Sequence, residues 1–202
     1  AIAAYLISLF EAERGENHRK QSFVDLGCGN GFLTYLLVEE GYPGKGIDIN
    51  KRGIWELYPD NVSQCLVQET VDPEVFVCPE VDWIIGNHSD ELTPWIPAIA
   101  AKSQNQSKYP RSEEASPKFF VLPCCFYDFD KKKFAFSTMR RSLAVPDTGD
   151  GKYAQYLNYI ERVCIAFGFG VNGKIERENM RIPSTKYVAL LGRSIQDRER
   201  TR

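Results

Sequence analysis

The sequence predicts an α/β fold with a mostly parallel, seven-stranded sheet covered by helices on both faces, and three observations support this. Short apolar runs rich in β-branched and aromatic residues recur along the 202 residues, with helical periodicity between them. Such alternation is typical of right-handed β–α–β crossovers. A glycine-rich segment, "DLGCGNG", separates the first strand from a helix. At 43% apolar residues, the chain can bury one core, so residues 1–202 are expected to form a single domain.

The predicted elements alternate from the start of the chain. A helical pattern covers residues 2–14 without a start signal, so we expect the chain to be a piece of a longer protein. Strands are expected at residues 22–26, 44–49, 64–67, 81–86, 118–122, 169–175 and 187–191. Further helices are expected at 31–40, after Asn50, at 92–102 and at 153–167. No helix fits between the last two strands, which should therefore form an antiparallel hairpin.

Composition and charge limit the classes of partner. The net charge of −2 gives no overall attraction to nucleic acid, so a polyanion would need a local basic patch. No apolar run of about 18 residues and no secretory signal are present, so no membrane contact and a cytoplasmic location are expected. Cysteines stand at positions 28, 65, 78, 124, 125 and 164. Because none forms a CxxC or lies near a histidine at ligand spacing, we expect reduced thiols and no metal.

The strongest chemical signal is the turn in "FVDLGCGNGF". Its glycines, Gly27, Gly29 and Gly31, permit positive φ and let backbone N–H groups approach a ligand. A dinucleotide fingerprint needs a small residue where Phe32 stands, so the pattern disfavours a nicotinamide cofactor without excluding it. Asp48 ends the second strand, where its carboxylate can accept hydrogen bonds from both hydroxyls of a ribose. The alternative is that the glycines only make a tight turn.

This arrangement resembles the Rossmann-like class I methyltransferases, which bind S-adenosylmethionine. In that family the turn faces the amino-acid end of the cofactor, and an acid after the second strand takes the ribose. A polar side chain after the third strand reaches the adenine, and Glu69 or Asp72 matches that position. The resemblance implies a set of cofactor-binding residues: Asp25, Gly27, Cys28, Gly29, Gly31, Asp48, Glu69 and Asn87.

The fourth predicted strand ends in "GNHSDE", which should open beside the sulfonium of that cofactor. Methyl transfer depends on positioning of donor and acceptor, so Asn87, His88 and Asp90 are candidate catalytic residues, with Ser89 and Glu91 beside them. His88 is a candidate general base, because its ordinary pKa suits proton removal near neutrality. The alternative is that Ser89, Asp90 and Glu91 cap the next helix.

Five stretches together resemble one family more closely: "VDLGCGNG", "GIDI", "DWIIGNHSDELTPWIP", "FFVLPCCFYDF" and "RIPSTKYV". They are similar to the tRNA uracil-2'-O-methyltransferases that modify a uridine near the variable arm of serine tRNA. This resemblance implies a cytoplasmic enzyme that methylates a ribose 2'-hydroxyl in tRNA. Two rival interpretations are a methyltransferase with a protein or small-molecule acceptor and an inactive methyltransferase fold that serves as an RNA scaffold.

A basic segment follows the fifth strand. Residues 128–141 contain five cations against two acids, and aromatic residues at 127, 129, 134 and 136 are interleaved with them. Cations and aromatic rings are the groups that bind phosphates and stack on unpaired bases. The candidate RNA-binding residues are Lys131, Lys132, Lys133, Arg140 and Arg141.

Overall fold

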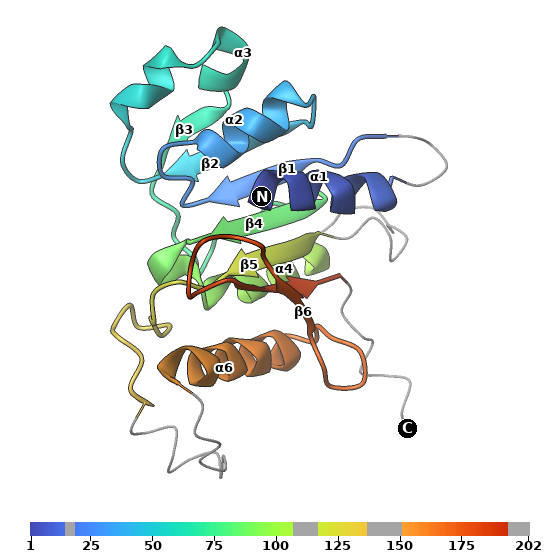
Figure 1. The fold of residues 1–202 in the computed structure, drawn as a ribbon, viewed down its shortest axis with the longest axis vertical. Helices are drawn as coiled ribbons and strands as arrows, with labels where there is room; N and C mark the ends of the chain where they lie inside the picture. The colour runs from blue at the N-terminus through green and yellow to red at the C-terminus, as the bar shows by residue number, and fades with distance from the viewer. Residues whose placement is uncertain (15–18, 107–116, 137–150, 194–202) are drawn as a thin grey trace.

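The structure is a computed structural model that describes residues 1–14, 19–106, 117–136 and 151–193. These residues form a seven-stranded sheet in the order β3-β2-β1-β4-β5-β7-β6. Figure 1 shows the strands stacked from β3 at one end to β6 near the other. No helix among the described residues is long and apolar enough to cross a membrane. The α/β fold predicted from the sequence is confirmed.

The first strand occupies the centre of the sheet. β1 (Phe23–Leu26) pairs in parallel with β2 (Gly44–Asp48) on one side and with β4 (Trp83–Asn87) on the other. β3 (Leu66–Gln68) continues the parallel sheet beyond β2, and β5 (Lys118–Leu122) continues it beyond β4. The strand order therefore reverses at β1, and the carboxyl ends of all five strands meet at one edge. In open α/β sheets this reversal is where ligands bind.

The last two strands close the sheet in antiparallel fashion, as predicted. β7 (Val188–Gly192) runs antiparallel to β5, and β6 (Glu176–Asn179) runs antiparallel to β7. The predicted strand at residues 169–175 was wrong. Three residues in that segment have positive φ, namely Gly170, Asn172 and Gly173, and Val171 bridges Lys174 across a tight turn. A chain turning at these positions cannot remain extended, so the strand begins only at Glu176.

Helices cover both faces of the sheet (Figure 1). α1 (Ile2–Ala12) and α2 (Phe32–Glu39) pack on one face, and α4 (Trp95–Asn105) and α6 (Lys152–Ala166) pack on the other. The strands supply both cores, with alternate residues of β5 pointing to opposite faces: Phe120 and Leu122 toward α1 and α2, and Phe119 and Val121 toward α4 and α6. This explains why the central strands are continuous apolar runs.

The predicted helix after Asn50 is replaced by two short pieces, η1 (Gly53–Leu57) and α3 (Asp60–Ser63). Pro59 lies between them and precedes the first residue of α3. Because proline has no N–H and disfavours a helical residue before it, one continuous helix cannot form across this position.

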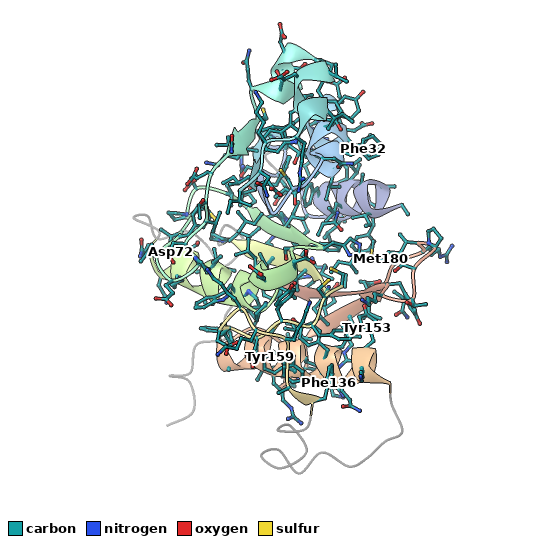
Figure 2. The ribbon with its side chains drawn as sticks, turned by 90° about the vertical axis from the view of Figure 1, so that its left-hand side faces the viewer. Phe32, Asp72, Phe136, Tyr153, Tyr159 and Met180 are labelled. Atoms are coloured by element: carbon teal, nitrogen blue, oxygen red, sulfur yellow. The ribbon has the colours of Figure 1, made fainter. Side chains whose placement is uncertain are left out.

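Aromatic side chains gather near α6. Figure 2 shows Phe136 and Tyr159 together there, while Phe32 lies toward the opposite end of the molecule.

Candidate cofactor and acceptor site

The glycine turn joins β1 to α2 at the strand-order reversal. Gly27, Gly29 and Gly31 have φ values of +74°, +58° and +75°, which L side chains rarely adopt. A Cβ at Gly31 would also lie 2.8 Å from the side chain of Leu66. All three positions therefore require glycine for conformation, and at Gly31 a side chain would in addition displace Leu66.

Asp48 ties this turn to the end of β2. Its carboxylate accepts a hydrogen bond from the N–H of Gly29 at 2.9 Å and another from the N–H of Asn50, also at 2.9 Å. The indole N–H of Trp55 donates to the carbonyl of Gly29 at 3.0 Å, so the peptide groups on both sides of Gly29 are held by side chains. Each carboxylate oxygen keeps a lone pair, so Asp48 can still accept from a ligand.

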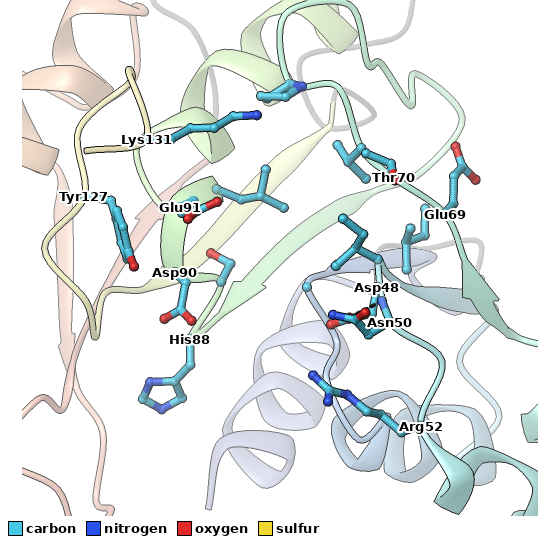
Figure 3. A pocket seen from close by; sticks show the side chains of 17 residues that line it. Asp48, Asn50, Arg52, Glu69, Thr70, His88, Asp90, Glu91, Tyr127 and Lys131 are labelled. Atoms are coloured by element: carbon cyan, nitrogen blue, oxygen red, sulfur yellow. Dashed lines mark hydrogen bonds between the residues drawn. The ribbon is translucent and has the colours of Figure 1, made fainter. Parts of the chain in front are cut away.

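A cavity of about 380 Å³ opens beside the turn, over the carboxyl ends of the parallel strands (Figure 3). Its wall includes Gly27, Asp48, Glu69, His88 and Asp90, so the structure brings these predicted site residues together. Five residues predicted to bind the cofactor lie outside the wall: Asp25, Cys28, Gly29, Gly31 and Asn87. These five belong to the turn and strands that support the cavity.

The electrostatics of this cavity favour a cation. Four carboxylates line it against two cations: Asp48, Glu69, Asp90 and Glu91 against Arg52 and Lys131. Apolar side chains stand between them, and Ile49, directly after Asp48, is 58% exposed. An acidic cavity with an apolar wall suits a ligand that carries both positive charge and a flat ring. The sequence analysis missed the apolar part of the wall, although the position of Ile49 next to Asp48 was a usable signal.

Two buried oxygens near the turn lack partners among the described residues: Oδ1 of Asp25 and Oδ1 of Asn87. The other oxygen of Asp25 accepts from the hydroxyl of Thr34 at 3.2 Å. Burial raises the pKa of Asp25 to about 7, with the Thr34 hydrogen bond opposing the shift and Asp48 adding to it. Unsatisfied buried acceptors are costly, so both oxygens mark places where a bound donor would lower the free energy.

Glu69 and Asp72, the two candidates for the adenine contact after β3, differ in position. Glu69 lies in the cavity wall, and its N–H donates to the carbonyl of Asp48 at 3.0 Å. Asp72 is exposed, and its carboxylate accepts from the N–H of Glu74 at 3.0 Å within a turn. Asp72 is therefore a turn residue, whereas Glu69 can reach a ligand.

The polar segment after β4 makes a sharp bend. His88 and Asp90 have positive φ values of +57° and +44°, and the N–H of His88 donates to the carbonyl of Leu122 at 3.3 Å. Positive φ in non-glycine residues costs about 1 kcal/mol and is concentrated at functional sites. Figure 3 shows His88, Asp90 and Tyr127 at one side of the cavity, facing Asp48 and Asn50.

The helix-cap alternative for this segment is wrong. Ser89 precedes a short 3₁₀ helix, η2 (Asp90–Leu92), without capping it through its side chain. Its hydroxyl lies 3.5 Å from that of Thr93, and α4 begins later, at Trp95. The segment is thus free to serve the cavity instead of the helix.

The protonation of His88 suits a base. Desolvation by neighbouring protein atoms lowers the pKa of His88 most, Asp90 opposes that shift, and the charge of Lys186 adds to it. The imidazole is therefore neutral at pH 7 and can accept a proton.

The predicted RNA-binding residues fall in different settings. Lys131 lines the cavity, Lys132 pairs with Asp130 at 3.1 Å, and the ammonium of Lys133 lies 3.6 Å from the ring centroid of Tyr127. Arg140 and Arg141 lie outside the described residues.

The aromatic side chains of this segment are mostly packed. Phe134 is buried in the core, 4.5 Å from Tyr159 between ring centroids, and Phe129 packs edge-on against Trp95 at 4.8 Å. The idea that Phe134 could stack on a base was wrong, because its ring points inward. The interleaved pattern in the sequence did not reveal which rings face solvent.

Comparison with known proteins identifies the class of this fold. A family model described as "Predicted AdoMet-dependent methyltransferase" matches residues 1–73. The methyltransferase domain of bacterial CtHen1 is similar in structure, with a TM-score of 0.53 over 95% of this chain and 96% of that chain at 9% identity. Together with the glycine turn and Asp48, these matches define a class I methyltransferase fold of the S-adenosylmethionine-dependent kind.

Two curated relatives are similar to this chain in sequence over nearly its whole length. A human protein named "Probable tRNA (uracil-O(2)-)-methyltransferase" is 45% identical over 96% of this chain and 23% of its own length. A Schizosaccharomyces pombe "tRNA (uracil-O(2)-)-methyltransferase" is 35% identical over 96% of this chain and 40% of its own length. The chain belongs to the family of these proteins, as the resemblance in the sequence predicted. It spans about a quarter of the human relative.

Proposed function

We propose that this protein transfers a methyl group from S-adenosylmethionine to the ribose 2'-hydroxyl of a uridine in tRNA, with serine tRNA as the substrate and the cytoplasm as the location. The observation that carries this proposal is the identity of 45% with the human relative across 96% of the chain. The glycine turn and the acidic cavity are supporting observations, because they match the needs of a cationic nucleoside cofactor.

The cofactor supplies a methyl group activated by a positively charged sulfur. In the proposal, the N–H groups of the glycine turn and the unpaired oxygens of Asp25 and Asn87 receive its amino-acid end. Asp48 accepts from the ribose hydroxyls while it holds Gly29 in place. Cys28 has a supporting role, since it is buried beneath the turn and burial raises the pKa of its thiol.

The acceptor side is assigned to the bend after β4. His88, neutral at pH 7, would take the proton of the ribose hydroxyl as that oxygen accepts the methyl group and the methyl–sulfur bond breaks, with S-adenosylhomocysteine leaving. Asn87 and Asp90 position the acceptor, and Lys131, at the edge of the same cavity, contacts a neighbouring phosphate. Lys132 and Lys133 extend the cationic surface beyond Lys131, and Arg140 and Arg141 complete the proposed set.

The test is nucleoside analysis after incubation of the protein with labelled S-adenosylmethionine and an unmodified serine tRNA transcript. The expected product is labelled 2'-O-methyluridine, and a transcript without the variable arm should accept less label. Label in a base, or in protein alone, would reject the ribose assignment. The variant His88→Gln should bind S-adenosylhomocysteine as well as the wild type and lose most methyl transfer, since general base catalysis contributes about 10²–10⁴-fold.

A further inference from the structure

Two cysteines that have no part in the proposed reaction lie against Asp90, a residue of the cavity wall. Cys124 and Cys125 follow β5, and β5 is the parallel neighbour of β4, with Asn87 paired with Leu122. The residues two or three positions beyond this pair therefore meet in space. On the β4 side that residue is Asp90, whose backbone bends through positive φ.

The ligand atoms of these three residues form a compact cluster. The carboxylate of Asp90 and the sulfurs of Cys124 and Cys125 all lie within 4.8 Å of one another, and among the described residues they are the group with spacing suited to a metal ion. The thiol of Cys124 donates a hydrogen bond to Oδ1 of Asp90 at 3.2 Å. Both thiols are half-buried, and all six cysteines are free. The cluster is thus formed before any ion binds.

We propose that Asp90, Cys124 and Cys125 bind a divalent cation of the zinc class. Thiolate ligands select Zn²⁺ over Mg²⁺ and Ca²⁺, which prefer oxygen. In a tetrahedral zinc site with Zn–S near 2.3 Å and Zn–O near 2.0 Å, a sulfur and an oxygen ligand stand about 3.5 Å apart. The 3.2 Å separation of the Cys124 sulfur and Asp90 Oδ1 is close to this value, so replacing the thiol proton by the metal needs little movement.

Three protein ligands leave one position of a tetrahedron for water or another molecule, which is the arrangement of catalytic and regulatory zinc sites. Asp90 itself lines the cavity, so the cation would lie at its edge, beside His88 and Tyr127 (Figure 3). The sequence predicted no metal, because CxxC and Cys–His spacings detect only ligands that are close together along the chain. Here one ligand comes from a different strand end, 34 positions away from Cys124.

Cobalt spectroscopy tests this site without cofactor or RNA, so its failure leaves the proposed methyl transfer untouched. The chain, reduced and freed of metal, is titrated with Co²⁺ and then with Zn²⁺. One Co²⁺ per chain is expected, with a sulfur-to-cobalt charge-transfer band in the near ultraviolet and the strong visible bands of tetrahedral Co²⁺. Zn²⁺ should displace it stoichiometrically. Absence of the charge-transfer band in the folded protein would overturn the proposal.

Variants assign the ligands. Cys124→Ser and Cys125→Ser should each lose stoichiometric Co²⁺ binding, whereas Asp90→Asn should keep the charge-transfer band and bind about 10-fold or more weakly. The matched control is Cys65→Ser, since that half-buried thiol contacts the Asn61 carbonyl at 3.2 Å, away from the cluster. Circular dichroism and Tm identify variants that fail to fold. If folded Cys124→Ser or Cys125→Ser binds Co²⁺ like the wild type, the assignment is wrong.

Discussion

Replacement of Asp48 by alanine tests the central contact of the proposed cofactor site. In the structure this carboxylate accepts N–H groups of Gly29 and Asn50, both at 2.9 Å, and stands in the cavity wall. Asp48→Ala removes these two hydrogen bonds together with any bond to a ligand ribose. The substitution therefore acts on both the shape of the turn and the affinity for the cofactor product, S-adenosylhomocysteine.

The expected loss of affinity follows from the charged acceptor. A hydrogen bond to a charged group contributes about 1.5–3 kcal/mol, so the dissociation constant for S-adenosylhomocysteine should rise about 10- to 200-fold. The two backbone donors are near the cavity, where water can replace the lost carboxylate in part. The free energy of unfolding should accordingly fall by only about 1–2 kcal/mol.

Isothermal titration calorimetry measures the affinity, and urea unfolding measures the stability of the same samples. The matched control is Glu56→Ala, which also removes one negative charge, from an exposed carboxylate that pairs with Lys51 at 2.8 Å. It should bind S-adenosylhomocysteine like the wild type. Unchanged affinity in folded Asp48→Ala would refute the ribose assignment, and an equal loss in both variants would mean that only the net charge matters.

Three further predictions concern buried and charged groups. Burial raises the pKa of Asp25 to about 7 from 3.8, so the folded state resists ionisation of this carboxyl group. The free energy of unfolding should therefore fall by about 4 kcal/mol as pH rises from about 4 to 7. Urea unfolding of Asp25→Asn should not show this fall. Asp82 is 3% exposed, and although burial opposes it, hydrogen bonds from Arg19 and Ser22 hold its pKa below the usual value. Its contribution to stability should therefore be present above about pH 4 and disappear as pH falls through the lowered pKa. Because the Arg19 partner is half exposed and water can solvate it, Asp82→Ala should cost about 1.5–3 kcal/mol in urea unfolding at pH 7. Lys131→Ala should weaken tRNA binding and reduce its salt dependence by about one counterion in filter-binding assays, and a loss of affinity that does not depend on salt would contradict the phosphate contact.

Local sequence was sufficient to predict the glycine turn and its acidic partner, Asp48. The turn needs glycine at fixed positions because its φ values are positive, and Asp48 is the last residue of β2, which pairs directly with β1. Both are properties of short segments and of the commonest crossover, so they can be predicted from residue types and spacing. The β6 strand was misplaced because the apolar residues Phe169, Val171 and Ile175 lie in the turn before it, whereas the strand itself, Glu176–Asn179, is wholly polar.

Burial and side-chain direction were decided by the tertiary structure. Phe134 and Lys133 are neighbours in sequence, yet one ring enters the core and the other side chain lies over Tyr127 at the surface. The sequence placed Asp25 beside the glycine turn, but only the structure shows that its carboxyl group is buried in β1, outside the cavity wall, with a pKa raised by burial. Periodicity predicts on which face of a strand a side chain lies. It does not predict whether solvent or a ligand can reach that side chain.

The sequence by itself determined the α/β fold, six of the seven strands, the glycine turn and Asp48, since each depends on the periodicity and residue types of short segments. Only the tertiary structure decided that Asp90 meets Cys124 and Cys125. The physical reason is that β4 and β5 are joined through α4 and yet lie side by side, so their ends share one edge of the sheet. Proximity of that kind depends on strand order and register, which no local pattern of residues contains.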